Sequence, residues 1–197
     1  VLDEAGLVLT ATGFLTRLPL PDNADWAPDR LVRASRYFPL AGALAGVCGG
    51  LVYWLAAQVL PAGVAAGLAL AALVGLTGAL HEDGLADCAD GLGGGRSTPE
   101  ALRIMRDSRI GTYGVIALVL AIGLRWAALA ALAPGSGALA LAIAGGAGRA
   151  MMVPATALAA YARTEGTGSL VARGAGPVEV AVALGTALAL ALIGGWA

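Results

Sequence analysis

The chain has no lysine: all 12 of its basic residues are arginine, and 13 acidic residues leave a net charge of -1. Only 13% of the residues are charged, about half of the roughly 25% found in soluble domains. This excludes an ordinary soluble domain, and the lack of excess positive charge argues against nucleic acid as a partner. With only two cysteines, Cys48 and Cys88, the chain has neither a disulfide framework nor a cysteine metal cluster, and we predict two free thiols.

Apolar residues are abundant instead, at 58% of the chain, and they form long uncharged runs. Such runs predict an all-α fold, a polytopic transmembrane helical bundle of about five spans that forms one domain over 1–197. A shorter apolar run suits a re-entrant or interfacial N-terminal helix. The recurrent glycine and alanine predict close helix packing. The expected short helix covers 5–18, and the expected spans cover 38–60, 64–80, 113–133, 138–160 and 178–197.

The arginines outside the spans alternate along the chain. They occupy the loops 19–37, 81–110 and 161–177, whereas the turns 61–63 and 134–137 are uncharged. Because basic loops stay on the cytoplasmic side, we predict a multi-pass protein of the cytoplasmic (inner) membrane whose polar site faces the cytoplasm.

One polar stretch, 81–114, holds six of the 13 acidic residues. Within it Asp83, Asp87 and Asp90 are spaced i, i+4, i+7, which places them on one stripe of a helix. Adjacent carboxylates repel one another unless a cation lies across them, and oxygen ligands with a phosphate-bearing partner suit Mg²⁺. We predict that these three aspartates bind Mg²⁺; the alternative is a solvated helix end.

Two interpretations are open for His81 and two for the run 91–96, which lie on either side of this stripe. His81, the only histidine, is either a general base or an interfacial hydrogen-bonding residue, and Glu82 is expected to be solvated. The run 91–96 either cradles a phosphate with backbone N–H groups and Arg96, or is a flexible linker. Ser97 and Glu100 have the spacing of a capping box, which predicts a short helix over about 99–108.

Further arginines follow in that short helix. Arg106 and Arg109 suit bidentate phosphate capture beside a metal site. Arg103 and Asp107, four residues apart, are the alternative: an ion pair within the helix.

Two arginines lie inside expected spans, where a charge is costly and marks a functional site by default. We expect Arg149 to face a substrate phosphate, a water-filled cavity, or helices absent from this sequence. Arg125 is expected to hydrogen-bond carbonyl groups in helix packing.

The stretches 81–91 and 104–114 closely resemble the cobalamin synthase (adenosylcobinamide-GDP ribazoletransferase) family, and 14–19, 36–40 and 161–168 match it further. The resemblance implies a membrane enzyme of the last stage of vitamin B12 biosynthesis. It would join adenosylcobinamide-GDP to α-ribazole or its 5′-phosphate, with Mg²⁺, and release GMP. Members of that family are longer and have a Gly-Thr-Gly-Asp-type motif near the end, and we expect this chain to lack that C-terminal segment.

The resemblance also implies site residues. Metal ligands are expected at Asp83, Asp87 and Asp90, and a second polar motif at Arg106, Asp107 and Arg109. The full set that we predict comprises catalytic residues His81, Asp83 and Asp107, and phosphate-binding residues Arg96, Arg106, Arg109 and Arg149.

The expected partners are the two substrates and the lipid bilayer, and a homo-oligomer is left open. The alternatives are a CDP-alcohol-type phosphotransferase or prenyltransferase, against which the stretch 104–114 argues, a transporter, and a non-catalytic membrane subunit. A transporter predicts polar residues spread through the spans, whereas here they gather near one membrane face.

Overall fold

The computed structural model describes residues 4–20, 27–159, 161–162 and 174–195, and within these ranges it contains helices and no strand. This confirms the all-α prediction. In chain order the helices are α1 (Glu4–Leu15), α2 (Pro28–Ala34), the 3-10 helix η1 (Ser35–Tyr37), α3 (Phe38–Ala56), α4 (Ala62–Thr77), α5 (Leu80–Gly94), α6 (Thr98–Ile104), α7 (Thr112–Ala130), α8 (Pro134–Leu158) and α9 (Pro177–Gly195).

Four of the described segments are long and apolar enough to cross a membrane: 29–56, α7, α8 and α9. Helices α4 and α5 form a fifth only when taken together, and the pair is bent by 89°. The prediction of about five spans with a short N-terminal helix is therefore confirmed. What the sequence did not indicate is that the second span turns sharply into the polar stretch.

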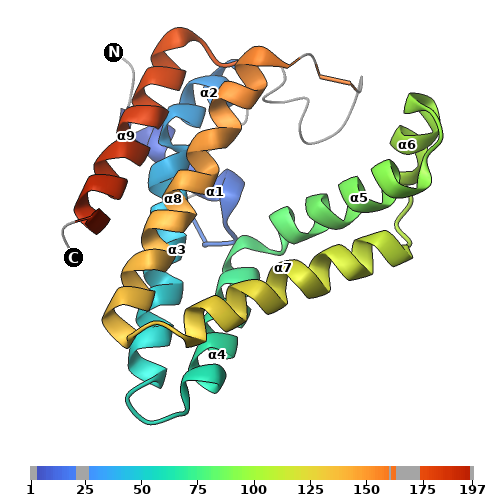
Figure 1. Cartoon of the computed structure of the whole chain (residues 1–197). Coiled ribbons are helices and arrows are strands. Elements are labelled where there is room, and N and C mark those ends of the chain that lie inside the picture. Colours follow the sequence, from blue (N-terminus) through green and yellow to red (C-terminus); the bar gives the residue numbers. More distant parts are fainter. Residues whose placement is uncertain (1–3, 21–26, 160, 163–173, 196–197) are drawn as a thin grey trace.

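The helices form a bundle with a projecting arm (Figure 1). Helices α3 and α8 lie side by side, with α9 on the outer side of α8. Helices α5 and α7 run beside each other away from this bundle, and α6 lies at the tip of the arm. The α3–α4 and α7–α8 turns lie at one end of the bundle, opposite to α2, as the alternation of charged and uncharged connections predicts.

Glycines let α3 and α8 approach closely, as the small-residue content predicts. Gly42, Gly46 and Gly50 lie one turn apart on α3, and each faces backbone atoms of α8. A Cβ at Gly46 would meet the carbonyl oxygen of Leu141 and lie 2.7 Å from the Cα of Ala142. Any side chain there must push the two helices apart.

We therefore expect Gly46→Ala to lower the free energy of unfolding by about 1–3 kcal/mol, the usual cost of overpacking. Thermal unfolding of the protein in lipid nanodiscs, followed by circular dichroism, measures this. Gly75→Ala on α4 is the matched control, because a Cβ there meets no atom within 4 Å and alanine is the better helix former. Equal destabilisation by both variants would contradict a close α3–α8 contact.

A second packing centre holds α7 to α3 and α4. Tyr53 is fully buried there among Ala65, Ala66, Ala69 and Leu129. Its hydroxyl lies 2.7 Å from the carbonyl oxygen of Leu129 and 2.8 Å from that of Leu132, at the end of α7. The phenol thus donates to carbonyl groups at the C-terminal end of α7, where the regular helical hydrogen bonds end. This contact fixes the inner end of the arm against the bundle.

The bend between α4 and α5 consists of two residues with left-handed backbones, Gly78 (φ 66°) and Ala79 (φ 58°). Gly78 ends α4, and Ala79 precedes the first residue of α5. The segment after α1 supports the bend, since the Arg17 N–H donates to the Leu76 carbonyl oxygen at 2.7 Å.

The arm's tip corrects one prediction and confirms another. The run 91–96 forms neither the predicted cradle of backbone N–H groups nor a flexible linker, because α5 continues through Gly94; the Arg96 side chain stays a predicted phosphate ligand. Its glycines allow close packing: a Cβ at Gly91 would lie 2.5 Å from Met105 Cγ, and one at Gly93 would lie 2.6 Å from the Tyr113 ring. The N-cap half of the predicted capping box is confirmed, because Ser97 Oγ accepts from the Glu100 N–H at 3.4 Å. The other half differs, since Glu100 Oε2 accepts from the Arg96 N–H at 3.0 Å, and the helix ends at Ile104, before the predicted 108.

Candidate functional site

A cavity of about 380 Å³ lies where α3, α4, α7 and α8 meet the start of α5. Apolar side chains cover most of its wall. Four charged or titratable side chains also line it: His81 and Glu82 from α5, Arg125 from α7 and Arg149 from α8. The fold thus places Arg125 and Arg149, the two arginines inside spans, beside the first residues of the polar stretch. His81 and Arg149 are 68 positions apart in the sequence.

Glu82 and Arg125 form an ion pair, with 3.0 Å between Glu82 Oε1 and Arg125 Nη1. The Glu82 side chain is only 15% exposed, so the prediction that it is solvated is wrong. The prediction that Arg125 bonds to carbonyl groups is also wrong. Both errors have one cause: α7 folds back along α5 and brings together residues 43 positions apart.

Arg149 brings a second guanidinium to the same place. Its stem packs against α3, where a Cβ at Gly42 would lie 2.8 Å from Arg149 Cδ. Its Nε is buried and has no hydrogen-bond partner among the described residues. Two guanidinium groups therefore face one carboxylate, and this excess of positive charge in an apolar wall favours an anionic or hydrogen-bond-accepting ligand. The expectation that Arg149 faces a cavity is confirmed.

His81 lines the same cavity and is half-buried. Its Nε2 and the Oε2 of Glu82 are buried without a hydrogen-bond partner among the described residues. Buried polar atoms without partners are rare in folded proteins and call for an explanation. Three of them, counting Arg149 Nε, border one cavity, which indicates a polar ligand.

Asp90 is occupied by the start of α7. Its Oδ2 accepts from the Gly111 N–H at 2.7 Å and its Oδ1 from the Gly114 N–H at 2.8 Å. The residue is 8% exposed, and its charge lies at the positive end of the α7 dipole. A side chain on either glycine would collide with the carboxylate. Asp90 thus joins α5 to α7, and both of its carboxylate oxygens are occupied by backbone N–H groups.

The predicted three-carboxylate metal site is consequently not assembled. No three His, Cys, Asp or Glu side chains gather closely enough to hold a metal ion in the described part of the chain. The helical stripe itself is correct, since all three aspartates lie on α5. The backbone N–H groups of α7 compete for Asp90, and the spacing of the aspartates does not reveal that competitor.

We expect Asp90→Asn to destabilise the arm by about 1–3 kcal/mol, because an amide offers one acceptor where the carboxylate offers two and leaves a buried N–H group unpaired. Hydrogen exchange at the first turn of α7 measures this. The Mg²⁺ concentration for half-maximal binding of Mg²⁺, if these aspartates bind it, should stay unchanged. A large rise in that concentration with unchanged exchange would instead show that Asp90 is a metal ligand.

Asp83 and Asp87 remain as a pair one turn apart on α5, Asp83 exposed and Asp87 half-buried. Side chains at this spacing have Cβ atoms about 5–6 Å apart. Mg²⁺ is usually held by one or two carboxylates together with phosphate oxygens and water. The two aspartates therefore fit Mg²⁺ bound jointly with a phosphorylated substrate, and they do not form an all-protein cage.

Asp107 pairs with Arg109 and not with Arg103. Asp107 Oδ2 lies 2.7 Å from Arg109 Nη2, and Oδ1 accepts from Arg109 Nε at 3.0 Å. These hydrogen bonds lower the pKa of the exposed Asp107 carboxyl from 3.8 to about 2. Asp107 is therefore ionised throughout the physiological pH range and cannot serve as an acid there.

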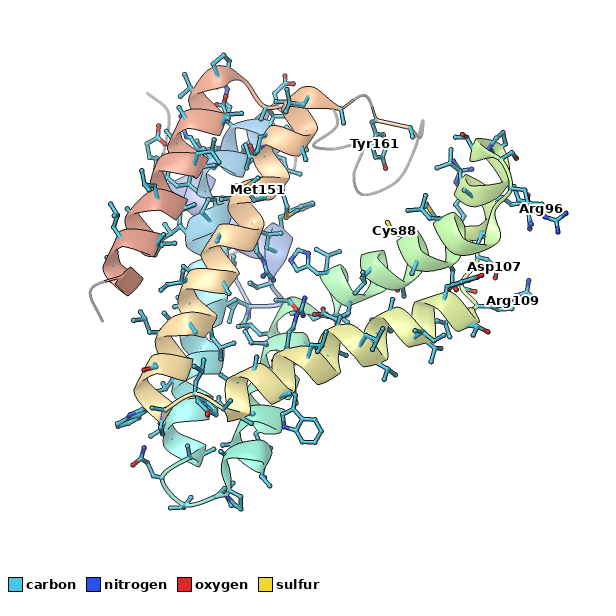
Figure 2. The ribbon with its side chains drawn as sticks, in the orientation of Figure 1. Cys88, Arg96, Asp107, Arg109, Met151 and Tyr161 are labelled. Carbon is cyan, nitrogen blue, oxygen red and sulfur yellow. The ribbon has the colours of Figure 1, made fainter. Side chains whose placement is uncertain are left out.

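Arg96, Asp107 and Arg109 lie at the tip of the arm, away from α8 (Figure 2). Arg106 follows α6 in the same connection. The 15 residues of α5 span about 22 Å at 1.5 Å per residue. Therefore the structure separates the predicted site residues into two groups: His81 and Arg149 at the bundle, and Arg96, Arg106, Asp107 and Arg109 at the tip, with Asp83 and Asp87 on the helix between them.

Sequence reasoning missed Glu82 and Arg125 as residues of the cavity. A signal was present: an arginine inside an expected membrane span needs a partner, and the nearest acidic residues along the chain lie in the polar stretch. A search for a carboxylate to pair with Arg125 would have suggested Glu82 as one candidate partner.

The model of the cobalamin-5-phosphate synthase family matches residues 7–197. A protein of Ralstonia nicotianae (strain ATCC BAA-1114 / GMI1000) named adenosylcobinamide-GDP ribazoletransferase is 54% identical over 124 residues, which are 62% of this chain and 48% of that protein. A protein of the same name from Shewanella sp. (strain W3-18-1) is 51% identical over 130 residues, 66% of this chain and 50% of the relative. The matched region spans about half the length of these curated relatives, and no solved structure matches. The chain belongs to the cobalamin-5-phosphate synthase family.

Proposed function

We propose that this chain carries the transferase site that joins adenosylcobinamide-GDP to α-ribazole or its 5′-phosphate and releases GMP, in a Mg²⁺-dependent reaction of vitamin B12 biosynthesis. The observation that carries the proposal is the cavity at the α4–α5 bend, whose polar end combines His81 with two guanidinium groups and borders the helix that holds Asp83 and Asp87. Family membership and the names of the relatives support it. They favour this transferase over a transporter, a non-catalytic subunit, or a CDP-alcohol-type phosphotransferase or prenyltransferase.

The transfer needs a nucleophilic hydroxyl, a stabilised diphosphate and a leaving group. The ribazole hydroxyl oxygen attacks the cobinamide-side phosphorus, the bond from that phosphorus to the bridging oxygen breaks, and GMP leaves. His81, which lines the cavity, would take the hydroxyl proton. Asp83 and Asp87 would hold Mg²⁺, which neutralises diphosphate oxygens and stabilises the departing phosphate when bound. Arg149 would supply a positive charge to the developing negative charge, within a largely apolar wall.

The charged residues at the tip of the arm have a different role in this proposal from that of the cavity residues. Arg96, Arg106 and Arg109 remain predicted phosphate ligands. Because they lie at the tip of the arm and not at the cavity, we propose that they contact another part of the GDP-bearing substrate. Asp107 contacts Arg109 and no cavity residue among the described side chains, so it is a positioning residue that orients that guanidinium.

The orientation in the membrane follows from the arginines. The spans that meet at the two uncharged turns have the arginine-bearing connections at their other ends. The positive-inside rule assigns these arginine-bearing connections to the cytoplasm. We therefore propose the cytoplasmic (inner) membrane with the site facing the cytoplasm. Whether the protein forms a homo-oligomer stays a prediction without a structural argument.

The test is to embed the chain in lipid nanodiscs, supply adenosylcobinamide-GDP, α-ribazole and Mg²⁺, and measure GMP by chromatography. GMP release that requires both substrates is the expected result. Inorganic phosphate or GDP as the product would contradict the proposed bond cleavage, and no release of any nucleotide would contradict the activity of this chain.

A further inference from the structure

We infer that the apolar part of the cavity binds the base of the ribazole substrate, and that residues of α7 and α8 in its wall determine which base is accepted. This inference rests on the proposed function. It concerns the recognition of the second substrate, for which sequence reasoning named no residue.

The wall offers dispersion contacts and few hydrogen bonds. Apart from the polar end and Thr77, the side chains that line it are aliphatic or absent, and they come from four helices. A flat dimethylbenzimidazole ring has a largely apolar surface and fits such a wall. Guanine has amide and amino groups along its edge, and burial without hydrogen-bond partners would cost about 1–3 kcal/mol for each group. The lining therefore favours the base of ribazole over the base of GDP.

The volume supports the same occupant. At about 380 Å³ the cavity lies near the lower end of the roughly 300–1,000 Å³ found for small-molecule sites. This is room for a bicyclic base and part of its sugar. The corrin macrocycle of the other substrate is far larger and has to lie outside.

The polar end distinguishes a nucleoside from a lipid chain. Glu82 Oε2, Arg149 Nε and His81 Nε2 have no hydrogen-bond partner among the described residues. A hydrocarbon chain would leave these groups unsatisfied, whereas ribose hydroxyls both donate to a carboxylate and accept from a guanidinium. With the base in the apolar part, the sugar lies at this polar end, next to the histidine that is placed to take a hydroxyl proton.

Two small changes in the wall alter the space for the base without touching the polar end. Ala144 on α8 and Ile122 on α7 both line the cavity. Ala144→Phe narrows it and Ile122→Ala widens it. Hydrophobic pockets discriminate about 10–200-fold for one methylene group, so changes of this size should alter base preference measurably.

The experiment is equilibrium binding of α-ribazole, and of an analogue with a single imidazole ring as its base, to the full chain in lipid nanodiscs without the GDP substrate. Ala144→Phe is expected to weaken α-ribazole at least about tenfold more than the small-base analogue. Ile122→Ala is expected to shift preference the opposite way, towards an analogue with a tricyclic base. Ala155→Phe is the matched control, since Ala155 is exposed on the same helix and does not line the cavity.

Equal losses of affinity for both nucleosides, or no loss with either wall variant, would overturn the inference. If Ala144→Phe does not fold, Ile122→Ala decides alone, because it removes volume and adds no clash. The readout separates this inference from the proposed function. Binding with the expected preferences but without GMP release contradicts the proposed reaction only, and GMP release with unchanged base preference in both variants contradicts the inference only.

Discussion

Asp87→Asn is expected to reduce GMP release by about 100- to 1,000-fold, because a neutral amide holds Mg²⁺ much less firmly than a carboxylate and the loss corresponds to several kcal/mol of transition-state stabilisation. Asp83→Asn should have an effect of the same order, since the two carboxylates lie one turn apart on α5. The measurement is the initial rate of GMP release against Mg²⁺ concentration. A metal ligand should raise the Mg²⁺ concentration required as well as lower the maximal rate.

Cys88→Ser is the control for this experiment, because Cys88 is the next residue on α5 and is exposed. Its rate should match the unaltered protein within about twofold, as expected for a surface change. Chelation of Mg²⁺ should abolish release in all variants, and added Mg²⁺ should restore it. Undiminished turnover by Asp87→Asn would remove this residue from the metal site.

Arg149→Met is expected to weaken substrate binding by about 10- to 100-fold, because one or two charge-assisted hydrogen bonds worth about 1.5–3 kcal/mol each are lost. The same change should stabilise the empty protein. Arg149 Nε is buried and has no hydrogen-bond partner in the part of the chain that the structure describes, and an unpaired charge inside a membrane protein is costly. Methionine keeps much of the stem that packs against Gly42. Affinity and thermal stability are therefore expected to change in opposite directions.

Isothermal titration and thermal unfolding of the same nanodisc samples measure both quantities. Arg33→Met is the control, since Arg33 is exposed on α2 and no cavity residue comes from that helix. Unchanged affinity combined with poor insertion would show that Arg149 serves folding only.

The long apolar runs predicted the spans well, because a membrane demands about 20 apolar residues whatever the rest of the fold does. Helix α3 begins at Phe38 as predicted, and α7 begins within one residue of its predicted start. The N-cap at Ser97 was also predictable, since its hydrogen bond joins residues three apart. Local signals determine these features.

The site was harder to predict, because its key contacts join distant residues. Asp90 lies on the predicted stripe, but the N-terminus of α7, more than 20 positions later, determines its role. Gly91 and Gly93 suggested a loop by intrinsic propensity, and packing against Met105 and Tyr113 overrides that preference. The pairing of Glu82 with Arg125 depends on where α7 runs, which no local pattern in α5 reveals.

Ala79 adopts a left-handed backbone that is unfavourable for a residue with a side chain, by roughly 1–2 kcal/mol. Straightening α4 into α5 would require both Gly78 and Ala79 to change their torsions together. The backbone torsions of Gly78 and Ala79 thus set the direction in which the arm leaves the bundle. This direction does not depend on the length of the arm. Homologues can therefore lengthen or shorten α5 and α7 by the same number of helical turns. The residues at the start of α5 would still point into the cavity.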